Sequence, residues 1–169
     1  MGPQETIACA IARKAHAGQT DKAGAPYIGH PAHVASQVEG DKAKAVAWLH
    51  DVVEDTPLTF DDLRAAGIDD DVIDALKLLT HDKSVPYMDY VAKLKRNELA
   101  HTVKLADLAH NSDLGRLFEV TDADRERVEK YRRAIALLRI ALAEGFSMAV
   151  TSQSIAERFE RWLRCCTVI

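Results

Sequence analysis

Apolar residues recur three and four positions apart along most of the chain, whereas the alternating pattern of a half-buried strand is nearly absent. This spacing predicts amphipathic helices, with glycine, proline and capping residues between them. The predicted helices cover residues 5–17, 31 onward, 41–55, 59 onward, 71–79, 86–96, 99–114, 121–143 and 152–166, with a loop over 19–29. The fold class is therefore predicted to be all-α, in a single compact domain over residues 1–169.

Capping residues indicate where two of these helices begin. Asp41 is predicted to cap the helix over residues 41–55, because its carboxylate can accept a hydrogen bond from a free N–H of the first turn. Thr59 and Asp62 are spaced as a capping box, in which each side chain binds the backbone N–H of the other residue.

The segment from Trp48 to Asp55 carries an acidic arc on an otherwise apolar helix. His50 and Glu54, four residues apart, share one face of the helix. Asp51 and Asp55 share the adjacent face. The apolar remainder predicts a central helix whose acidic face lines a cavity. Carboxylates beside an imidazole in a cavity are costly unless a cation or a proton relieves them, so a bound metal is one interpretation and a solvated acidic face is the other.

Two further groups of polar residues could complete such a site. Lys104, Asp107 and Asn111 fall on one stripe of a predicted helix and offer a cation, a carboxylate and an amide. His30 stands before Pro31 at a junction between loop and helix, which holds it in an extended geometry from which it can reach another helix. Taken alone, a stripe such as that of Lys104, Asp107 and Asn111 is usually a solvated face. An isolated histidine is more commonly a capping or core residue than a ligand.

Three segments together resemble the HD superfamily of metal-dependent phosphohydrolases, whose ligands occur in the order H…HD…D. AGAPYIGHP, HDVVEDT and VKLADLAHN are similar to the hydrolase domain of the RelA/SpoT family and to stand-alone small alarmone hydrolases, over about residues 7–117. The resemblance implies an HD-domain fold, to which the predicted helices over residues 121–166 would be added. It also implies removal of the 3′-pyrophosphate of (p)ppGpp, the alarmone of the stringent response.

The same resemblance assigns roles to individual residues. The usual metal is Mn²⁺, although another divalent cation stays open, since two nitrogens and two carboxylates suit several such ions. Glu54 would orient or deprotonate the attacking water, and Asp55 would assist or protonate the leaving group. The matched positions are the metal ligands His30, His50, Asp51 and Asp107, the acidic pair Glu54 and Asp55, and the nucleotide or phosphate contacts Lys22, Lys104 and Asn111.

Two positions depart from the family pattern in the region of the base and the sugar. Asp21 stands where relatives commonly have an arginine that packs against guanine, and an aspartate repels phosphate. Leu114 stands where relatives often place a polar residue near the ribose. Hydrolysis of another nucleotide, such as the 2′-phosphate of NADPH or an adenine alarmone, is therefore an alternative. A non-catalytic nucleotide-sensing helical module is disfavoured, because no ligand or acid of the family set is missing.

Composition and net charge limit the classes of molecule that the protein is expected to bind. Hydrophobic residues make up 47% of the 169 residues and charged residues 28%, and the net charge of −4 argues against nucleic-acid or membrane-surface binding. A small nucleotide is the expected partner. Cys9, Cys165 and Cys166 form no disulfide or zinc-knuckle pattern, which together with the absence of a secretory leader predicts a cytoplasmic protein. The stripe of Phe159 and Trp162 is typical of a core or a dimer interface, so a homodimer stays open.

Overall fold

The computed structural model describes residues 1–145, with side chains to residue 140. The compact unit Met1–Leu138 contains every candidate metal-binding, catalytic and nucleotide-contact residue, whereas the predicted stripe of Phe159 and Trp162 lies outside the described residues. The regular secondary structure of the described residues is helical, apart from an isolated bridge between Thr20 and Pro26, so the all-α prediction is confirmed. The elements are α1 (Pro3–Ala15), α2 (Gly29–Ser36), α3 (Asp41–Leu49), α4 (Val52–Asp55), α5 (Phe60–Ala65), α6 (Asp70–Leu79), α7 (Tyr87–Leu94), α8 (Glu98–Asn111), the 3₁₀ turn η1 (Leu114–Arg116) and α9 (Asp122–Gly145). The helix predicted over 152–166 lies outside the described residues.

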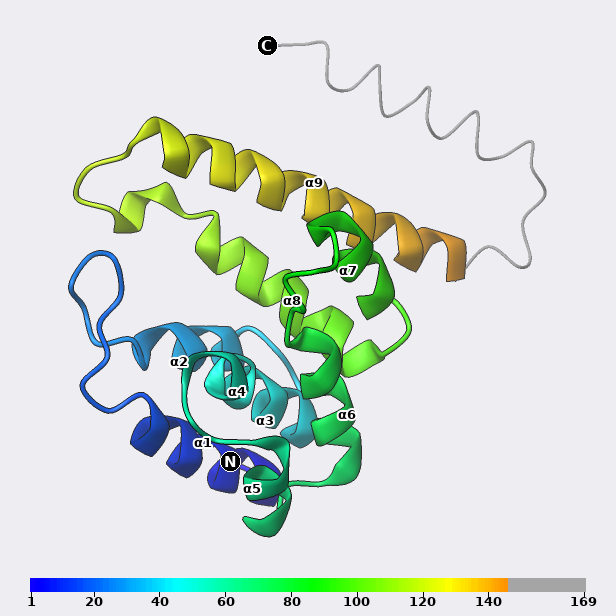
Figure 1. Ribbon diagram of the computed structural model, residues 1–169. Coiled ribbons are helices and arrows are strands. Elements are labelled where there is room, and N and C mark those ends of the chain that lie inside the picture. Colours follow the sequence, from blue (N-terminus) through cyan, green and yellow to red (C-terminus); the bar gives the residue numbers. More distant parts are fainter. Residues whose placement is uncertain (146–169) are drawn as a thin grey trace. The chain divides into compact units, whose positions relative to one another are not determined.

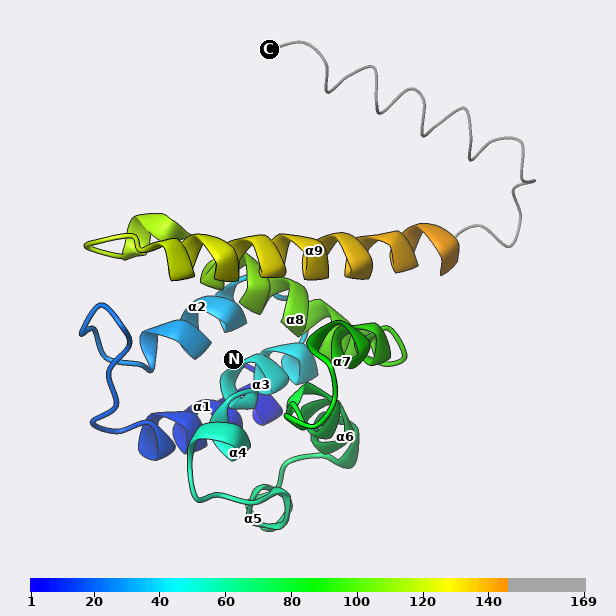
Figure 2. The same cartoon turned by 45° about the horizontal axis from the view of Figure 1, so that its top comes forward.

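Helix α3 is the centre of the core. It packs against α1, α2, α6 and α8, and both Figure 1 and Figure 2 place it between α1 and α8. Its side chains from Ala45 to Leu49 are all buried, including that of Trp48. The sequence prediction that this helix is central is therefore confirmed. A helix with the length and apolar surface needed to span a lipid bilayer is not found among residues 1–145.

The chain from Asp41 to Asp55 is not the single continuous helix that its sequence predicts. Helix α3 ends at Leu49, and α4 begins only at Val52. Asp51 keeps a right-handed backbone, but its φ of −103° and ψ of −7° depart from helical values and interrupt the regular turn. The N–H of Asp55 still donates to the carbonyl of Asp51 at 2.9 Å, so α4 continues directly from this junction.

The prediction that Asp41 caps its own helix is wrong. Gly40, with a φ of +90°, occupies the N-cap of α3, and Asp41 is the first residue inside the helix. The carboxylate of Asp41 instead accepts hydrogen bonds from the backbone N–H groups of Gln4 at 3.1 Å and Glu5 at 2.8 Å. Asp41 therefore caps α1, whose own N-cap, Gly2, has no side chain to do so.

Replacing Asp41 by alanine is expected to lower the free energy of unfolding by about 1–2 kcal/mol, because it leaves two N–H groups at the start of α1 without their acceptor. Urea unfolding followed by circular dichroism measures the change. Asp74→Ala is the control, since Asp74 makes an exposed ion pair with Lys77 and should cost less than about 0.5 kcal/mol. Equal losses from the two substitutions would contradict a capping role.

The capping box predicted at the start of α5 is confirmed. The hydroxyl of Thr59 accepts from the N–H of Asp62 at 3.2 Å, and the carboxylate of Asp62 accepts from the N–H of Thr59 at 2.8 Å. Helix α8 ends three residues earlier than predicted, because the chain turns after Asn111 and Leu114 enters η1.

Candidate metal centre and nucleotide pocket

Three segments distant in sequence bring two histidines and two aspartates together. His30 lies in the first turn of α2, His50 and Asp51 form the junction of α3 with α4, and Asp107 lies in α8. Nε2 of His30 lies 3.1 Å from Nε2 of His50 and 3.2 Å from Oδ1 of Asp107. Oδ2 of Asp51 lies 3.1 Å from Nε2 of His50. The four side chains predicted as metal ligands thus point at one another.

This donor set fits a divalent cation. One ligand atom from each of His30, His50 and Asp107 lies within 4.8 Å of the others, and all three residues are buried. Asp51 adds a second carboxylate from the partly exposed side. Two imidazole nitrogens and two carboxylates carry two negative charges when the imidazoles are neutral, which a divalent ion neutralises.

Without a cation, protons compensate the carboxylates of this cluster. Burial opposes the charged form of His30, but the hydrogen bonds and charges of Asp107 and Asp51 outweigh it and raise its pKa to about 9. Burial likewise opposes the charge of His50, and the neighbouring Asp51 raises its pKa nevertheless. The pKa of Asp107 is lowered even though burial raises it, because Lys104 and His30 stabilise the carboxylate. Positive charge is therefore favoured where the ligand atoms meet.

Lys104 and Asn111, predicted to contact the nucleotide or its phosphates, both bind Asp107. Nζ of Lys104 donates to Oδ2 of Asp107 at 2.8 Å, and Nδ2 of Asn111 donates to Oδ1 at 2.6 Å. The side chain of Lys104 is only 16% exposed. These contacts hold the Asp107 carboxylate in one orientation and leave the remaining hydrogen-bonding capacity of both side chains for a ligand.

Tyr27 is a residue of this cluster to which the sequence assigned no role. Its hydroxyl donates to Oδ2 of Asp51 at 2.6 Å and lies 3.4 Å from Oδ2 of Asp55. Burial, followed by the charge of Asp51, raises the pKa of Tyr27, so the hydroxyl keeps its proton and remains a donor. The signal was its position three residues before His30, one turn away from a predicted ligand.

Glu54 and Asp55 lie on α4 at the exposed rim of the cluster rather than inside a cavity. Burial and the charge of Asp51 raise the pKa of Asp55, which favours its protonated form more than in water. Oε2 of Glu54 lies 3.5 Å from the backbone N–H of His81, a long contact that leaves the carboxylate available.

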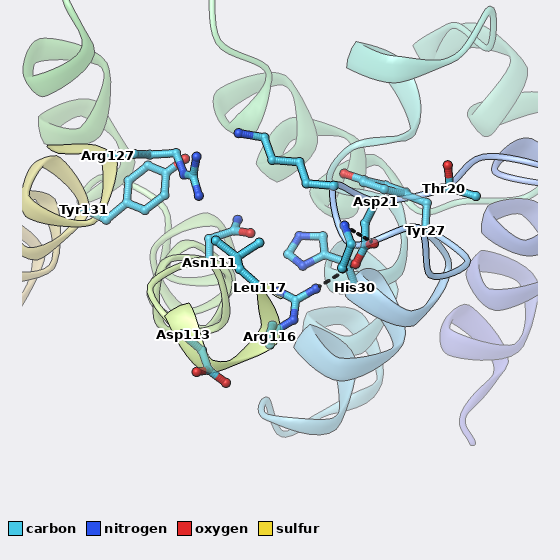
Figure 3. Close-up of a pocket in the computed structure, with 12 residues that line it drawn as sticks. Thr20, Asp21, Tyr27, His30, Asn111, Asp113, Arg116, Leu117, Arg127 and Tyr131 are labelled. Atoms are coloured by element: carbon cyan, nitrogen blue, oxygen red, sulfur yellow. Dashed lines mark hydrogen bonds and ion pairs between the residues drawn. The ribbon is translucent and has the colours of Figure 1, made fainter. Parts of the chain in front are cut away.

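A pocket of about 440 Å³ opens next to His30 (Figure 3). Lys22 lies at its edge with a 70% exposed side chain, 4.0 Å from Asp124. Arg116 and Arg127 add two cations to which the sequence analysis assigned no role. Both lie outside the three motif segments that resemble the family and share no helical spacing with them. The lining residues are Thr20, Asp21, Lys22, Ala23, Tyr27, His30, Asn111, Asp113, Arg116, Leu117, Arg127 and Tyr131.

Asp21, which the sequence analysis expected to repel phosphate, has a positively charged partner in the structure. Its Oδ2 accepts a hydrogen bond from Nη2 of Arg116 at 3.2 Å, as the dashed line between them in Figure 3 marks. Its Oδ1 accepts from the backbone N–H groups of Ala23 and Ala25, each at 2.9 Å, and so shapes the loop. Leu117 rather than Leu114 lines the pocket on this side.

Several known proteins are similar to this chain in sequence. No protein-family model matches the chain. It is 39% identical over 115 residues to the guanosine-3′,5′-bis(diphosphate) 3′-pyrophosphohydrolase of Haemophilus influenzae, a match that covers 60% of this chain and 17% of that protein. It is 32% identical over 128 residues to guanosine-3′,5′-bis(diphosphate) 3′-pyrophosphohydrolase MESH1 of Danio rerio, which covers 66% of this chain and 68% of that one. The chain thus spans about a sixth of the bacterial relatives and about two thirds of MESH1.

A solved structure supports the same fold. The structure described as a metazoan ortholog of SpoT that hydrolyzes ppGpp superposes with a TM-score of 0.66 at 23% sequence identity. The match covers 85% of this chain and 94% of that one. The predicted HD-type arrangement of helices is therefore confirmed.

Proposed function

This chain belongs to the HD-type family of guanosine-3′,5′-bis(diphosphate) 3′-pyrophosphohydrolases, and from that membership we propose that it removes the 3′-pyrophosphate of (p)ppGpp. The observation that supports this most directly is the convergence of His30, His50 and Asp107 within 4.8 Å beside a pocket of about 440 Å³. That volume lies in the range of small-molecule sites. The proposed metal is Mn²⁺, held by these three residues and Asp51.

The side chains around the cluster can divide the work of hydrolysis. A divalent cation, when bound, polarises a phosphate oxygen and lowers the pKa of water from about 15.7 toward about 7. Glu54 takes a proton from the attacking water, whose oxygen bonds to the phosphorus next to the ribose 3′ oxygen. The bond from that phosphorus to the 3′ oxygen breaks, and Asp55 gives the 3′ oxygen its proton. The products are pyrophosphate and a nucleoside 5′-di- or triphosphate.

The cations of the pocket and of the neighbouring metal cluster suit the phosphates of such a substrate. Lys22, at the exposed edge, can follow a phosphate as a mobile point charge. Lys104 and Asn111 are fixed by Asp107 and can contact the leaving pyrophosphate from the buried side. The proposal includes a cytoplasmic location, which a nucleotide substrate of this kind and the free thiol of Cys9 support.

A second candidate is hydrolysis of another nucleotide phosphate, such as the 2′-phosphate of NADPH or an adenine alarmone. The observation that favours it is the Asp21–Arg116 pair, because it gives this wall of the pocket a different arrangement of charge from the family pattern. The metal cluster is the same in both candidates.

A nucleotide panel tests the two candidates. Purified protein loaded with Mn²⁺ is incubated with ppGpp, pppGpp, ppApp and NADPH, and release of pyrophosphate or phosphate is measured against a His50→Ala control. We expect pyrophosphate from the guanine substrates at a rate well above the control. Activity on NADPH or ppApp alone would establish the second candidate. Metal binding without hydrolysis of any member would support a non-catalytic nucleotide-sensing module instead.

Metal affinity is expected to rise with pH, because bound metal replaces the protons that the free cluster holds. The pKa of His30 is about 9 in the folded metal-free protein, against about 6.5 when unfolded. Protonated His30 therefore adds its full contribution to the free energy of unfolding of the metal-free protein below pH 6.5, and this contribution is lost as pH rises through 9. Over the same pH range, the apparent affinity for the metal rises about tenfold per pH unit for each proton that metal binding displaces.

Calorimetric titration with Mn²⁺ at pH 7.0, 7.5, 8.0 and 8.5 measures this dependence. Repeating it in buffers of different ionisation enthalpy counts the protons released. His30→Gln, which has no titrating ring, should bind more weakly and with a flatter pH profile. Equal affinity of the wild-type protein at pH 7.0 and 8.5 would contradict proton displacement.

A further inference from the structure

The second ring nitrogen of His30 faces away from the metal cluster and meets another histidine. Nε2 of His30 points toward His50 and Asp107, whereas its Nδ1 lies 2.7 Å from Nδ1 of His110. The planes of the two rings differ by only 9°, with centroids 5.0 Å apart. His110 belongs to α8, so this contact joins segments 80 residues apart in sequence.

The contact determines which nitrogen of His30 carries the proton. A histidine binds a metal through an unprotonated nitrogen, so Nε2 of His30 must be free of hydrogen and Nδ1 must carry it. Nδ1–H then needs an acceptor, and the atom within reach is Nδ1 of His110. The opposite assignment, with His110 as donor, would put the proton of His30 on Nε2 and block the cluster.

Two neighbours orient the ring of His110 and keep its Nδ1 a hydrogen-bond acceptor. Its ring stacks on that of His33, with centroids 4.0 Å apart and planes 15° apart, which fixes its plane. Nη1 of Arg116 lies 3.3 Å from Nδ1 of His110 and 3.4 Å from its carbonyl oxygen. A guanidinium N–H can only donate, so Nδ1 of His110 carries a lone pair and the ring proton is on Nε2.

We propose that His110 is a positioning residue of the metal centre, which accepts the Nδ1–H of His30 and thereby leaves Nε2 free to bind the metal. The inference rests on the metal site of the proposed function, but not on its substrate. Metal-binding histidines commonly donate to a carboxylate or a carbonyl, and these outer partners are worth about 10–100-fold in metal affinity. Here the imidazole of His110 is that outer partner, and His33 contributes only by stacking on it.

A matched pair of substitutions separates the hydrogen bond from the stack. His110→Phe keeps a flat ring against His33 but removes the acceptor, and is expected to weaken Mn²⁺ binding by about 10–100-fold in calorimetry. His33→Phe keeps the stack and is expected to bind Mn²⁺ within about threefold of the wild-type protein. His110→Asn can present its carbonyl oxygen to Nδ1 of His30 and should recover most of the affinity.

A spectroscopic measurement on the full chain reports the protons directly. In protein loaded with diamagnetic Zn²⁺, the ring ¹⁵N shifts should show the Nδ1–H form for His30 and the Nε2–H form for His110. Wild-type affinity of His110→Phe, or equal losses for His110→Phe and His33→Phe, would overturn the proposal. If the wild-type protein binds metal without hydrolysing ppGpp, the proposed function fails while this inference stands. Absence of metal binding by the wild-type protein would overturn both.

Discussion

Replacing Asp107 by asparagine is expected to abolish divalent-metal binding and to lower hydrolysis by more than about 100-fold. Asp107 is buried, its Oδ1 lies 3.2 Å from Nε2 of His30, and hydrogen bonds from Lys104 and Asn111 hold both of its oxygens. Asparagine has the same shape but removes one of the two negative charges that favour a cation. The expected loss is larger than the roughly 10–100-fold typical of a residue that only supports a ligand.

Unfolding experiments with and without Mn²⁺ measure this effect independently of activity. At a metal concentration 100 times its dissociation constant, the wild-type protein should gain about 2.7 kcal/mol, and Asp107→Asn should gain nothing. Asp74→Asn is the control, because Asp74 is exposed on α6 and, within residues 1–140, pairs with Lys77 alone. If the loss of the Lys104 partner prevents folding, Asp51→Asn gives the same test at a side chain that is 23% exposed. Wild-type metal stabilisation of both variants would exclude these residues as ligands.

The sequence was sufficient for features that depend on residues close together in the chain. Helical spacing predicted the all-α class, and the apolar surface around Trp48 predicted that this helix is central. The capping box of Thr59 and Asp62 needs only a separation of three residues, and it is present. Each of these features follows from the geometry of a single helix, which the sequence determines locally.

Helical spacing carries no information on which helices meet, so the convergence of His30, His50 and Asp107 was predicted only through the family resemblance. Distant pairs outside the family motifs could not be predicted. Asp41 caps a helix 37 residues away, and Asp21 binds Arg116 from a distance of 95 residues. The predicted cap by Asp41 on its own helix is wrong because of its tertiary contact, and Asp21 has a cationic partner that its sequence context does not indicate. The partner of a charged side chain is what decides its role, and it was visible only in the fold.

Removing the carboxylates of α4 is expected to affect catalysis while leaving metal binding intact. Glu54 and Asp55 are exposed, whereas Asp51 lies 3.1 Å from Nε2 of His50 and His30, His50 and Asp107 are buried. Glu54→Gln and Asp55→Asn preserve shape but can neither accept nor release a proton in the reaction. Each should lower kcat by about 10²–10⁴-fold, the usual contribution of general acid–base catalysis. The dissociation constant for Mn²⁺ should stay within about threefold.

The two carboxylates should differ in their effect on the pH profile. The raised pKa of Asp55 suits a proton donor, whose activity falls as pH rises through that pKa, so Asp55→Asn should remove the alkaline limb belonging to this group. Glu54→Gln should lower kcat without removing that limb, because Glu54 is not the proton donor. Glu129→Gln, on the exposed face of α9, is the matched control and should leave kcat and its pH profile unchanged. A loss of metal binding in parallel with kcat would show that these carboxylates hold the cation rather than move protons.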